Sequence, residues 1–156
     1  MQPRIRSLVK KLKKIHPTSA ADLRRGKIKF RFLDEGCYRK VYSILGTGTV
    51  IKFPFAAKKE YLSDSIAHAL REMMAFSKVR KRRKFRKHLP KIYYQDLLNG
   101  VMLMKEYRRG GTDDWKEKAL IRRFRNSFRS PCGDLGWYNM GRDEKGTNIF
   151  LDLGLF

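Results

Sequence analysis

Residues 27–53 read KIKFRFLDEGCYRKVYSILGTGTVIKF, and this stretch decides the fold class. Apolar and basic residues alternate from Lys27 to Phe32, which is the two-residue period of a half-buried strand. Two more strands are predicted over Val41–Leu45 and Thr49–Phe53. The turns between the strands are Asp34-Glu35-Gly36 and Gly46-Thr47-Gly48. Because tight turns join antiparallel neighbours, the stretch predicts an antiparallel sheet.

Helices are predicted before and after this stretch. A basic amphipathic helix over Arg4–Ile15 precedes it, and Asp22–Gly26 is expected to be a connector. A second helix over Ser63–Val79 follows it, with Asp64 or Ser65 as its N-cap. The stripe expected to face the core is Ile66, Leu70, Met73 and Ser77.

The rest of the chain predicts two more strands, a helix and a short hairpin. The strands are Lys91–Gln95 and Val101–Glu106, joined by Asp96–Gly100. The helix runs from Thr112 or Asp113 to Arg129, with Trp115, Ala119, Leu120 and Phe124 towards a core. Brief extended pieces are Trp137–Met140 and Thr147–Leu151. This order of elements predicts an α+β fold with an antiparallel sheet of five strands.

The composition excludes several classes of protein. Hydrophobic residues make up 42% of the 156 residues, so the chain can bury a core and is not a disordered tail. No stretch has the length of a membrane span, and the basic N-terminus lacks the apolar segment of a secretory signal. The two cysteines, Cys37 and Cys132, fit neither a disulfide framework nor a zinc site. We therefore expect a cytoplasmic protein.

The net charge of +22 predicts a polyanionic partner. Most of the positive charge lies in Met1–Lys14, in Lys78–His88 and in Lys116–Arg129. Nucleic acid and an acidic protein are the partners that we consider for this surface. We favour packing of the N-terminal helix on the sheet over its contact with a membrane.

Four pieces of sequence carry residues suited to chemistry. Lys52 lies within an apolar strand, where an ammonium is costly unless it is paired. Glu72 lies in the middle of the helix that follows. Asp134-Leu135 precedes Asn139, and Asp152-Leu153-Gly154 follows the last predicted strand.

This ordered set resembles the motifs of the protein-kinase superfamily. That family pairs a strand Lys with a helix Glu and has a D-L-x-x-x-N loop followed by a D-F-G motif. The segment Gly36-Cys37-Tyr38-Arg39-Lys40-Val41 resembles a reduced glycine-rich loop, and Gly100–Tyr107 resembles the strand that leads to the adenine-binding hinge. The resemblance covers about residues 28–156. Within the superfamily the chain resembles the PhoP-regulatory-network family and, more distantly, small kinase-ATPases of tRNA modification.

The resemblance implies a protein-kinase-like fold and a set of site residues. The N-lobe would be 27–107, with one regulatory-type helix, preceded by a basic helix and connector in 1–26 and followed by a minimal helical C-lobe in 108–156. The cofactors would be ATP and Mg²⁺. Asp134 would be catalytic, and Asn139 and Asp152 would bind the metal. The residues implied for nucleotide binding are Gly36, Arg39, Val41, Lys52, Glu72, Met104 and Glu106.

The chain also departs from the family pattern. Cys132-Gly133 replaces the His-Arg before the catalytic Asp, and Leu153 replaces the Phe of D-F-G. The sequence ends two residues after Gly154, so we expect no activation segment and no later helical lobe. An apolar face around Trp115, Phe124, Trp137 and Phe156 would then be covered by a protein partner or a second copy.

Two functions are compatible with these observations. The first is an ATP- and Mg²⁺-dependent phosphotransferase, either a minimal Ser/Thr-type kinase with an unknown protein substrate or an ATPase. The alternative is a catalytically weak kinase-like scaffold whose basic surface binds nucleic acid or an acidic protein. Purely structural roles also stay open: Lys52 could extend to solvent from an edge strand and Glu72 could be a solvated surface residue. Asp134, Asn139 and Asp152 could be turn residues.

Overall fold

The structure is a computed structural model that describes residues 1–109, 115–128 and 139–153. It divides into two compact units, which are described separately. The first unit is Met1–Leu70 with Lys91–Glu106, and the second is Arg71–Pro90 with Tyr107–Phe156. The helix α3 (Leu62–Arg80) begins in the first unit and ends in the second.

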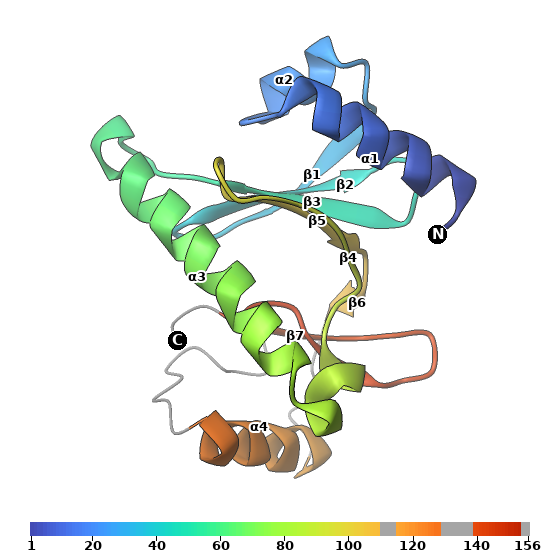
Figure 1. The fold of residues 1–156 in the computed structure, drawn as a ribbon, viewed down its shortest axis with the longest axis vertical. Coiled ribbons are helices and arrows are strands. Elements are labelled where there is room, and N and C mark those ends of the chain that lie inside the picture. The colour runs from blue at the N-terminus through green and yellow to red at the C-terminus, as the bar shows by residue number, and fades with distance from the viewer. Residues whose placement is uncertain (110–114, 129–138, 154–156) are drawn as a thin grey trace. The chain divides into compact units, whose positions relative to one another are not determined.

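The first unit is built on the five-stranded antiparallel sheet that the sequence predicts (Figure 1). The strand order is β1-β2-β3-β5-β4, so β3 lies in the middle of the sheet. The strands are β1 (Phe30–Glu35), β2 (Arg39–Ile44), β3 (Thr49–Pro54), β4 (Ile92–Asp96) and β5 (Val101–Lys105). The α+β class is therefore confirmed.

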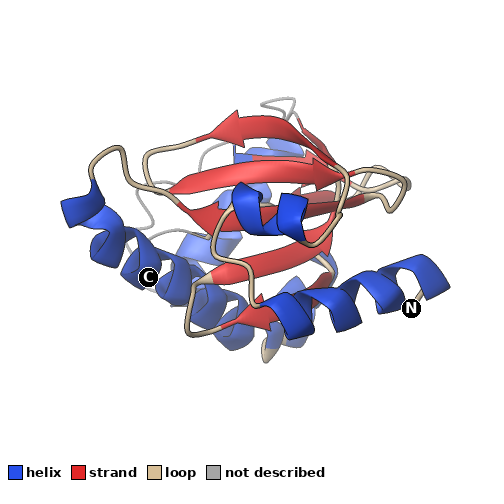
Figure 2. Ribbon diagram, turned by 90° about the horizontal axis from the view of Figure 1, so that it is seen from above, coloured by secondary structure: helices blue, strands red, loops and turns tan. Residues whose placement is uncertain are grey.

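Two helices, α1 (Pro3–Ile15) and α2 (Ala20–Arg25), lie on the same face of this sheet (Figure 2). Apolar residues of α1 recur at helical spacing and are buried: Ile5, Leu8, Val9 and Leu12. They form one core cluster with Ile51, Phe53 and Leu103 of the central strands. The predicted packing of the N-terminal helix on the sheet is thus confirmed, and its basic residues face outward.

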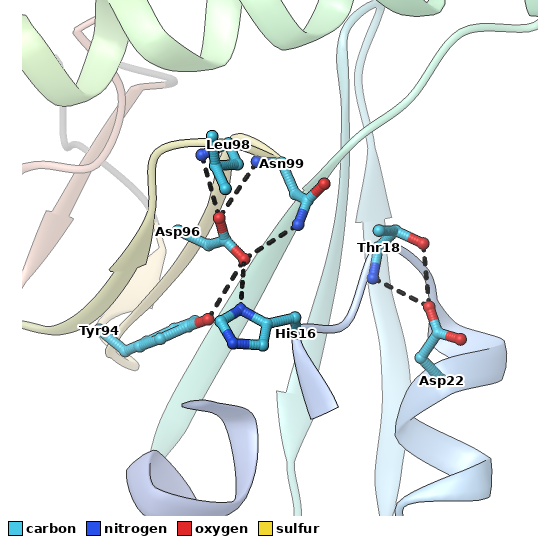
Figure 3. A network of polar contacts seen from close by, with 7 residues as sticks. All are labelled: His16, Thr18, Asp22, Tyr94, Asp96, Leu98 and Asn99. Atoms are coloured by element: carbon cyan, nitrogen blue, oxygen red, sulfur yellow. Dashed lines mark hydrogen bonds and ion pairs between the residues drawn. The ribbon is translucent and has the colours of Figure 1, made fainter. Parts of the chain in front are cut away.

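A polar network holds the C-terminal end of α1 against the β4–β5 turn (Figure 3). The Asp96 carboxylate accepts hydrogen bonds from the backbone N–H groups of Leu98 and Asn99 and from the Asn99 side chain, and His16 Nδ1 lies 3.5 Å from it. Burial alone would raise the pKa of Asp96, but the hydrogen bonds from Asn99 and Leu98 outweigh it and keep this pKa below its ordinary value. The carboxylate is therefore stabilised in its charged form.

Two predictions for the first unit are wrong at the level of local structure. Asp22–Gly26 is not a connector, because 20–25 form α2, whose first turn is held by the Asp22 carboxylate accepting from the N–H groups of Thr18 and Ser19. Asp34 and Glu35 are not turn residues either, since β1 continues through them and the turn begins at Gly36.

The helix α3 differs from its prediction at its start and in its buried stripe. It begins at Leu62, directly after a short 3₁₀ turn (Lys59–Tyr61), so neither Asp64 nor Ser65 is its N-cap. The Ser65 hydroxyl donates instead to the carbonyl oxygens of Phe55 and Tyr61. Ser77 is exposed, whereas Phe76 and Val79 are buried.

The second unit combines α4 (Trp115–Phe128), a 3₁₀ helix η2 (Arg83–His88) and a small antiparallel sheet of order β6-β7-β8. The strands are β6 (Arg108–Arg109), β7 (Met140–Arg142) and β8 (Asn148–Phe150). An aromatic cluster of Phe85, Phe124, Phe128 and Phe150 joins these elements. Trp115 was predicted to face the core, but its side chain is 74% exposed, because it lies at the first position of α4.

The caps Thr112 and Asp113, the end of the predicted helix at Arg129, and the first two residues of the piece Trp137–Met140 fall outside the described residues. Within the described ranges, no helix is both long enough and apolar enough to cross a bilayer.

Candidate functional site

The hairpin β7–β8 brings two predicted metal ligands to the same end of one element. Asn139 directly precedes β7, and Asp152 follows β8 after a single intervening residue. Met140 pairs with Phe150, and the Leu151 N–H donates to the Asn139 carbonyl oxygen at 2.8 Å. The hairpin pairing therefore extends to Asn139, and Asp152 is the next residue on the opposite strand. Amide and carboxylate oxygens are ligands that Mg²⁺ accepts.

The other end of this hairpin is a well-braced turn. The Asp143 carboxylate accepts from the backbone N–H groups of Lys145 and Thr147, at 2.9 and 2.7 Å. Arg142 donates to the Asn148 side chain and pairs with the buried carboxylate of Glu117 at 3.3 Å. These contacts brace the turn and tie the hairpin to α4.

Gly141 lies in β7 at a position where the packing leaves no room for a side chain. A Cβ there would come within 2.9 Å of the Leu151 side chain and 3.0 Å of the Arg108 carbonyl oxygen. The absent side chain lets β6 and the residue after β8 approach β7 closely. This close packing lies next to both predicted metal ligands, because Gly141 is two residues after Asn139 and Leu151 directly precedes Asp152.

Lys52 lies on the middle strand of the five-stranded sheet and is only 6% exposed. Its neighbours Ile51 and Phe53 belong to the core beneath α1, so the alternating pleat directs Lys52 to the other face of the sheet. A buried Lys on a central strand is not one that extends to solvent from an edge, and this structural alternative is therefore excluded. The ammonium is costly at such a place unless it is paired.

Val41 and Met104, two more of the predicted nucleotide-binding residues, share that face with Lys52. Val41 is the cross-strand partner of Lys52, and Val50, two residues before Lys52, is the partner of Met104. Directly opposed residues of an antiparallel pair project from the same side of the sheet. We call the side that carries Val41, Lys52 and Met104 the lysine face. These residues place the Lys52 cation near two apolar side chains, and Arg39, two residues before Val41 on β2, projects from the same side of the sheet.

The turn between β1 and β2 corresponds to the reduced glycine loop. The Gly36 N–H donates to the Arg39 carbonyl oxygen, and the Phe55 N–H donates to the Tyr38 carbonyl oxygen. The Tyr38 ring stacks on His68 of α3 at a centroid distance of 4.5 Å. The sequence did not predict this stack, because no sequence spacing relates a residue in a turn to one in a distant helix.

Gly36 is a glycine that the fold itself does not require. A Cβ at this position meets no atom within 4 Å, and Gly36 is not among the residues with positive φ. Backbone without a side chain is, however, what close approach of a phosphate uses.

Arg39 and Glu106 brace the structure around this face. The buried Arg39 guanidinium donates to the Gly100 carbonyl oxygen at 2.7 Å and to that of Ala69 at 3.4 Å. The Glu106 carboxylate accepts from the Ser43 hydroxyl at 2.8 Å, while the Glu106 N–H donates to the Gly48 carbonyl oxygen. Both side chains therefore have structural partners in the first unit.

Glu72 and Asp134 complete the predicted set. The Glu72 side chain is 0% exposed, which excludes the alternative of a solvated surface residue. Glu72 belongs to the second unit and Lys52 to the first, so their ion pair stays a prediction. Asp134 lies outside the described residues. Among the residues that are described, no group of three or more His, Cys, Asp or Glu side chains converges as a metal site.

No protein-family model matches this chain, and a search of curated proteins finds no match. A function for the chain is therefore inferred from its fold class and from the geometry of its described residues.

Proposed function

We propose that this chain is an ATP- and Mg²⁺-dependent phosphotransferase with a protein-kinase-like fold. The observation that carries the proposal is the hairpin β7–β8, which has Asn139 immediately before its first strand and Asp152 just after its second. In a kinase, the metal-binding Asn and Asp flank a strand pair in the same chain order.

The roles follow from what phosphoryl transfer needs. The reaction depends on positioning and charge neutralisation more than on covalent chemistry. Asn139 and Asp152 would hold Mg²⁺, which supplies positive charge to the phosphate oxygens. Lys52 would contact the α- and β-phosphates, and Glu72 would orient Lys52. Asp134 would accept the proton of the attacking hydroxyl.

The lysine face supports the nucleotide part of the proposal. Val41 and Met104 place apolar side chains on the same side of the sheet as the Lys52 cation. Gly36 is exposed and a Cβ there would meet no atom within 4 Å, so the backbone of the turn that it begins is open to close approach of a phosphate. These features are the ones expected of a strand face and a glycine turn that enclose a nucleotide.

Titration calorimetry of the full chain with ATP, in the presence and absence of Mg²⁺, tests the proposal. We expect Mg²⁺-dependent binding, and an affinity about 10-fold or more weaker in Asp152→Asn, because the metal loses a charged ligand. The matched control is Glu144→Gln, which removes the same charge from the exposed turn of the same hairpin and should bind as the wild type does. Absence of binding at millimolar ATP with Mg²⁺, or equal effects of both variants, would refute the proposal.

A further inference from the structure

The second unit carries a basic pocket that the proposed phosphotransfer chemistry does not use. It has a volume of about 630 Å³ and lies between η2 and α4. Its polar lining is Arg83, Lys84, Lys87, His88 and Arg123, and its apolar lining is Phe85 and Leu120. A role for this pocket is independent of the proposed phosphotransferase function.

The pocket is built on a rigid base. The buried ring of Phe85 packs edge-on against Phe124 of α4 with centroids 5.1 Å apart. His88 Nδ1 donates to the Asn148 carbonyl oxygen at 2.8 Å, which ties the end of η2 to β8. These contacts hold η2 against α4 and β8, so the elements that carry the cations are in place before a ligand binds.

The Lys and Arg side chains that line the pocket are exposed. Within the ranges that the structure describes, Arg83, Lys84, Lys87 and Arg123 form no ion pair with an acidic side chain. Their positive field is felt at His88, whose pKa is lowered by burial and by Lys87 and Arg123. Like charges that gather around one pocket without counter-charges form a field for an anionic ligand.

The positive charge extends beyond what one phosphate would use. The run Lys78–His88 contains eight Lys and Arg residues in eleven positions. On α4, Lys116 precedes Leu120 by one helical turn and so lies on the pocket side. An isolated phosphate needs only two or three converging donors, whereas a row of cations matches a chain of phosphates.

The shape of the pocket favours single-stranded over double-stranded nucleic acid. A duplex presents its phosphates on a wide cylinder, which meets a surface but does not fill a pocket. A single strand can insert a nucleotide, and about 630 Å³ lies within the range of pockets that hold small organic ligands. The apolar lining suits a sugar or base face, while the surrounding cations suit its phosphates. We propose that this pocket binds the phosphodiester backbone of single-stranded nucleic acid without reading its sequence.

Fluorescence anisotropy with a labelled oligouridylate of about 20 nucleotides, titrated with the full chain, tests this proposal. The pocket variant carries Arg83→Gln, Lys87→Gln and Arg123→Gln. The matched control carries Lys10→Gln, Lys13→Gln and Lys14→Gln, three exposed residues of α1 with the same loss of charge. Oligothymidylate, duplex DNA and an acidic phosphopeptide serve as competitors. Arg123→Gln alone repeats the comparison with the smallest change to the fold.

The expected result follows from counterion release. The pocket variant should lose about 100-fold in affinity at about 0.1 M salt, and its salt dependence should be lower in slope by about 2, because each lost contact removes about 0.7. Arg123→Gln alone should lose about 5-fold on the same basis. The α1 control should stay within about 3-fold of the wild type, since a distant charge is screened. Stronger competition by oligouridylate identifies RNA as the preferred ligand, and stronger competition by oligothymidylate identifies DNA.

Three results would overturn the proposal. Equal losses in the pocket variant and the α1 control would mean that total charge, rather than this pocket, governs binding. Stronger competition by duplex DNA would exclude a single-strand site. Stronger competition by the acidic phosphopeptide would identify a protein partner instead.

Discussion

Lys52 and Glu72 are two charged residues that are almost completely removed from solvent. Burying a charge costs several kcal/mol before pairing offsets it. Buried charged residues are therefore frequent at functional sites. The sequence already marked Lys52, because an ammonium inside an apolar strand conflicts with the strand's pattern. The sequence did not show that Lys52 is buried or that it shares a side of the sheet with Val41 and Met104, because both depend on how β2, β3 and β5 pair.

Replacing Lys52 tests its assignment to the nucleotide. In Lys52→Met we expect the Kd for ATP with Mg²⁺ to rise about 10- to 100-fold, because charge-assisted contacts to phosphate contribute about 1.5–3 kcal/mol. Calorimetry measures this directly. Lys29→Met, an exposed residue of the same unit, is the control and should leave the Kd unchanged. An unchanged Kd in Lys52→Met would mean that this lysine does not contact the nucleotide.

His88 gives the second unit a pH dependence. Burial, with the nearby Lys87 and Arg123, lowers the pKa of His88 from its ordinary value of 6.5. The folded state therefore disfavours the protonated ring, and the unfolded chain binds the proton first. Stability is unaffected above about pH 6.5 and is lost as the pH falls from there through the lower folded-state pKa.

Denaturant unfolding at a series of pH values checks this expectation. Between about pH 7 and about pH 5, the free energy of unfolding of the wild type should fall more steeply than that of His88→Gln, which does not titrate. The Gln side chain carries no titrating group, so its pH profile is the reference for the contribution of His88. Parallel pH profiles of the two proteins would show that His88 is not perturbed.

At the scale of elements, long periodic segments were predictable and short ones were not. The apolar spacing of Arg4–Ile15 and the alternation after Lys27 identified α1 and β1. The six residues of α2 are too few for a period, and a side chain, Asp22, stabilises its start. The strand β6 is still shorter, and it exists because its partner β7 pairs with it. The exposure of Trp115 likewise depends on where α4 begins.

The Asp96 network is an element-scale device, because it joins the end of α1 to the β4–β5 turn (Figure 3). We expect Asp96→Ala to lower the free energy of unfolding at pH 7 by about 2 kcal/mol, since several donors lose their acceptor. Because the folded-state pKa of Asp96 is depressed, this contribution is full above about 3.8 and is lost as the pH falls through the lower folded-state pKa.

Chemical denaturation of Asp96→Ala and Asp96→Asn at neutral and acid pH measures both effects. Asp96→Asn keeps one acceptor oxygen without a titrating group, so it should be destabilised less. The deficit of Asp96→Ala against the wild type should shrink in acid. A deficit that is absent at neutral pH would mean that solvent replaces the carboxylate at no cost.

At the scale of the whole molecule, the sequence predicted the five antiparallel strands of the larger sheet and a short hairpin near the C-terminus, although β7 extends to Arg142, beyond the predicted end of its strand at Met140. The spacing of Asn139 and Asp152 along the chain suggested a hairpin, and the structure has one there. The basic pocket could not be foreseen, because a charge run such as Lys78–His88 has the same sequence whether it forms a flat face or lines a cavity with α4. The run lines a cavity because Phe85 of η2 packs against Phe124 of α4.

A crystal structure of the chain with a non-hydrolysable ATP analogue and Mg²⁺ would test the proposed nucleotide and metal site at once. We expect the Lys52 ammonium to contact the α- and β-phosphates, and Asn139 and Asp152 to ligate the same metal ion. A nucleotide bound away from the lysine face, or a metal ion that neither Asn139 nor Asp152 ligates, would show that the chain does not bind ATP as a kinase does.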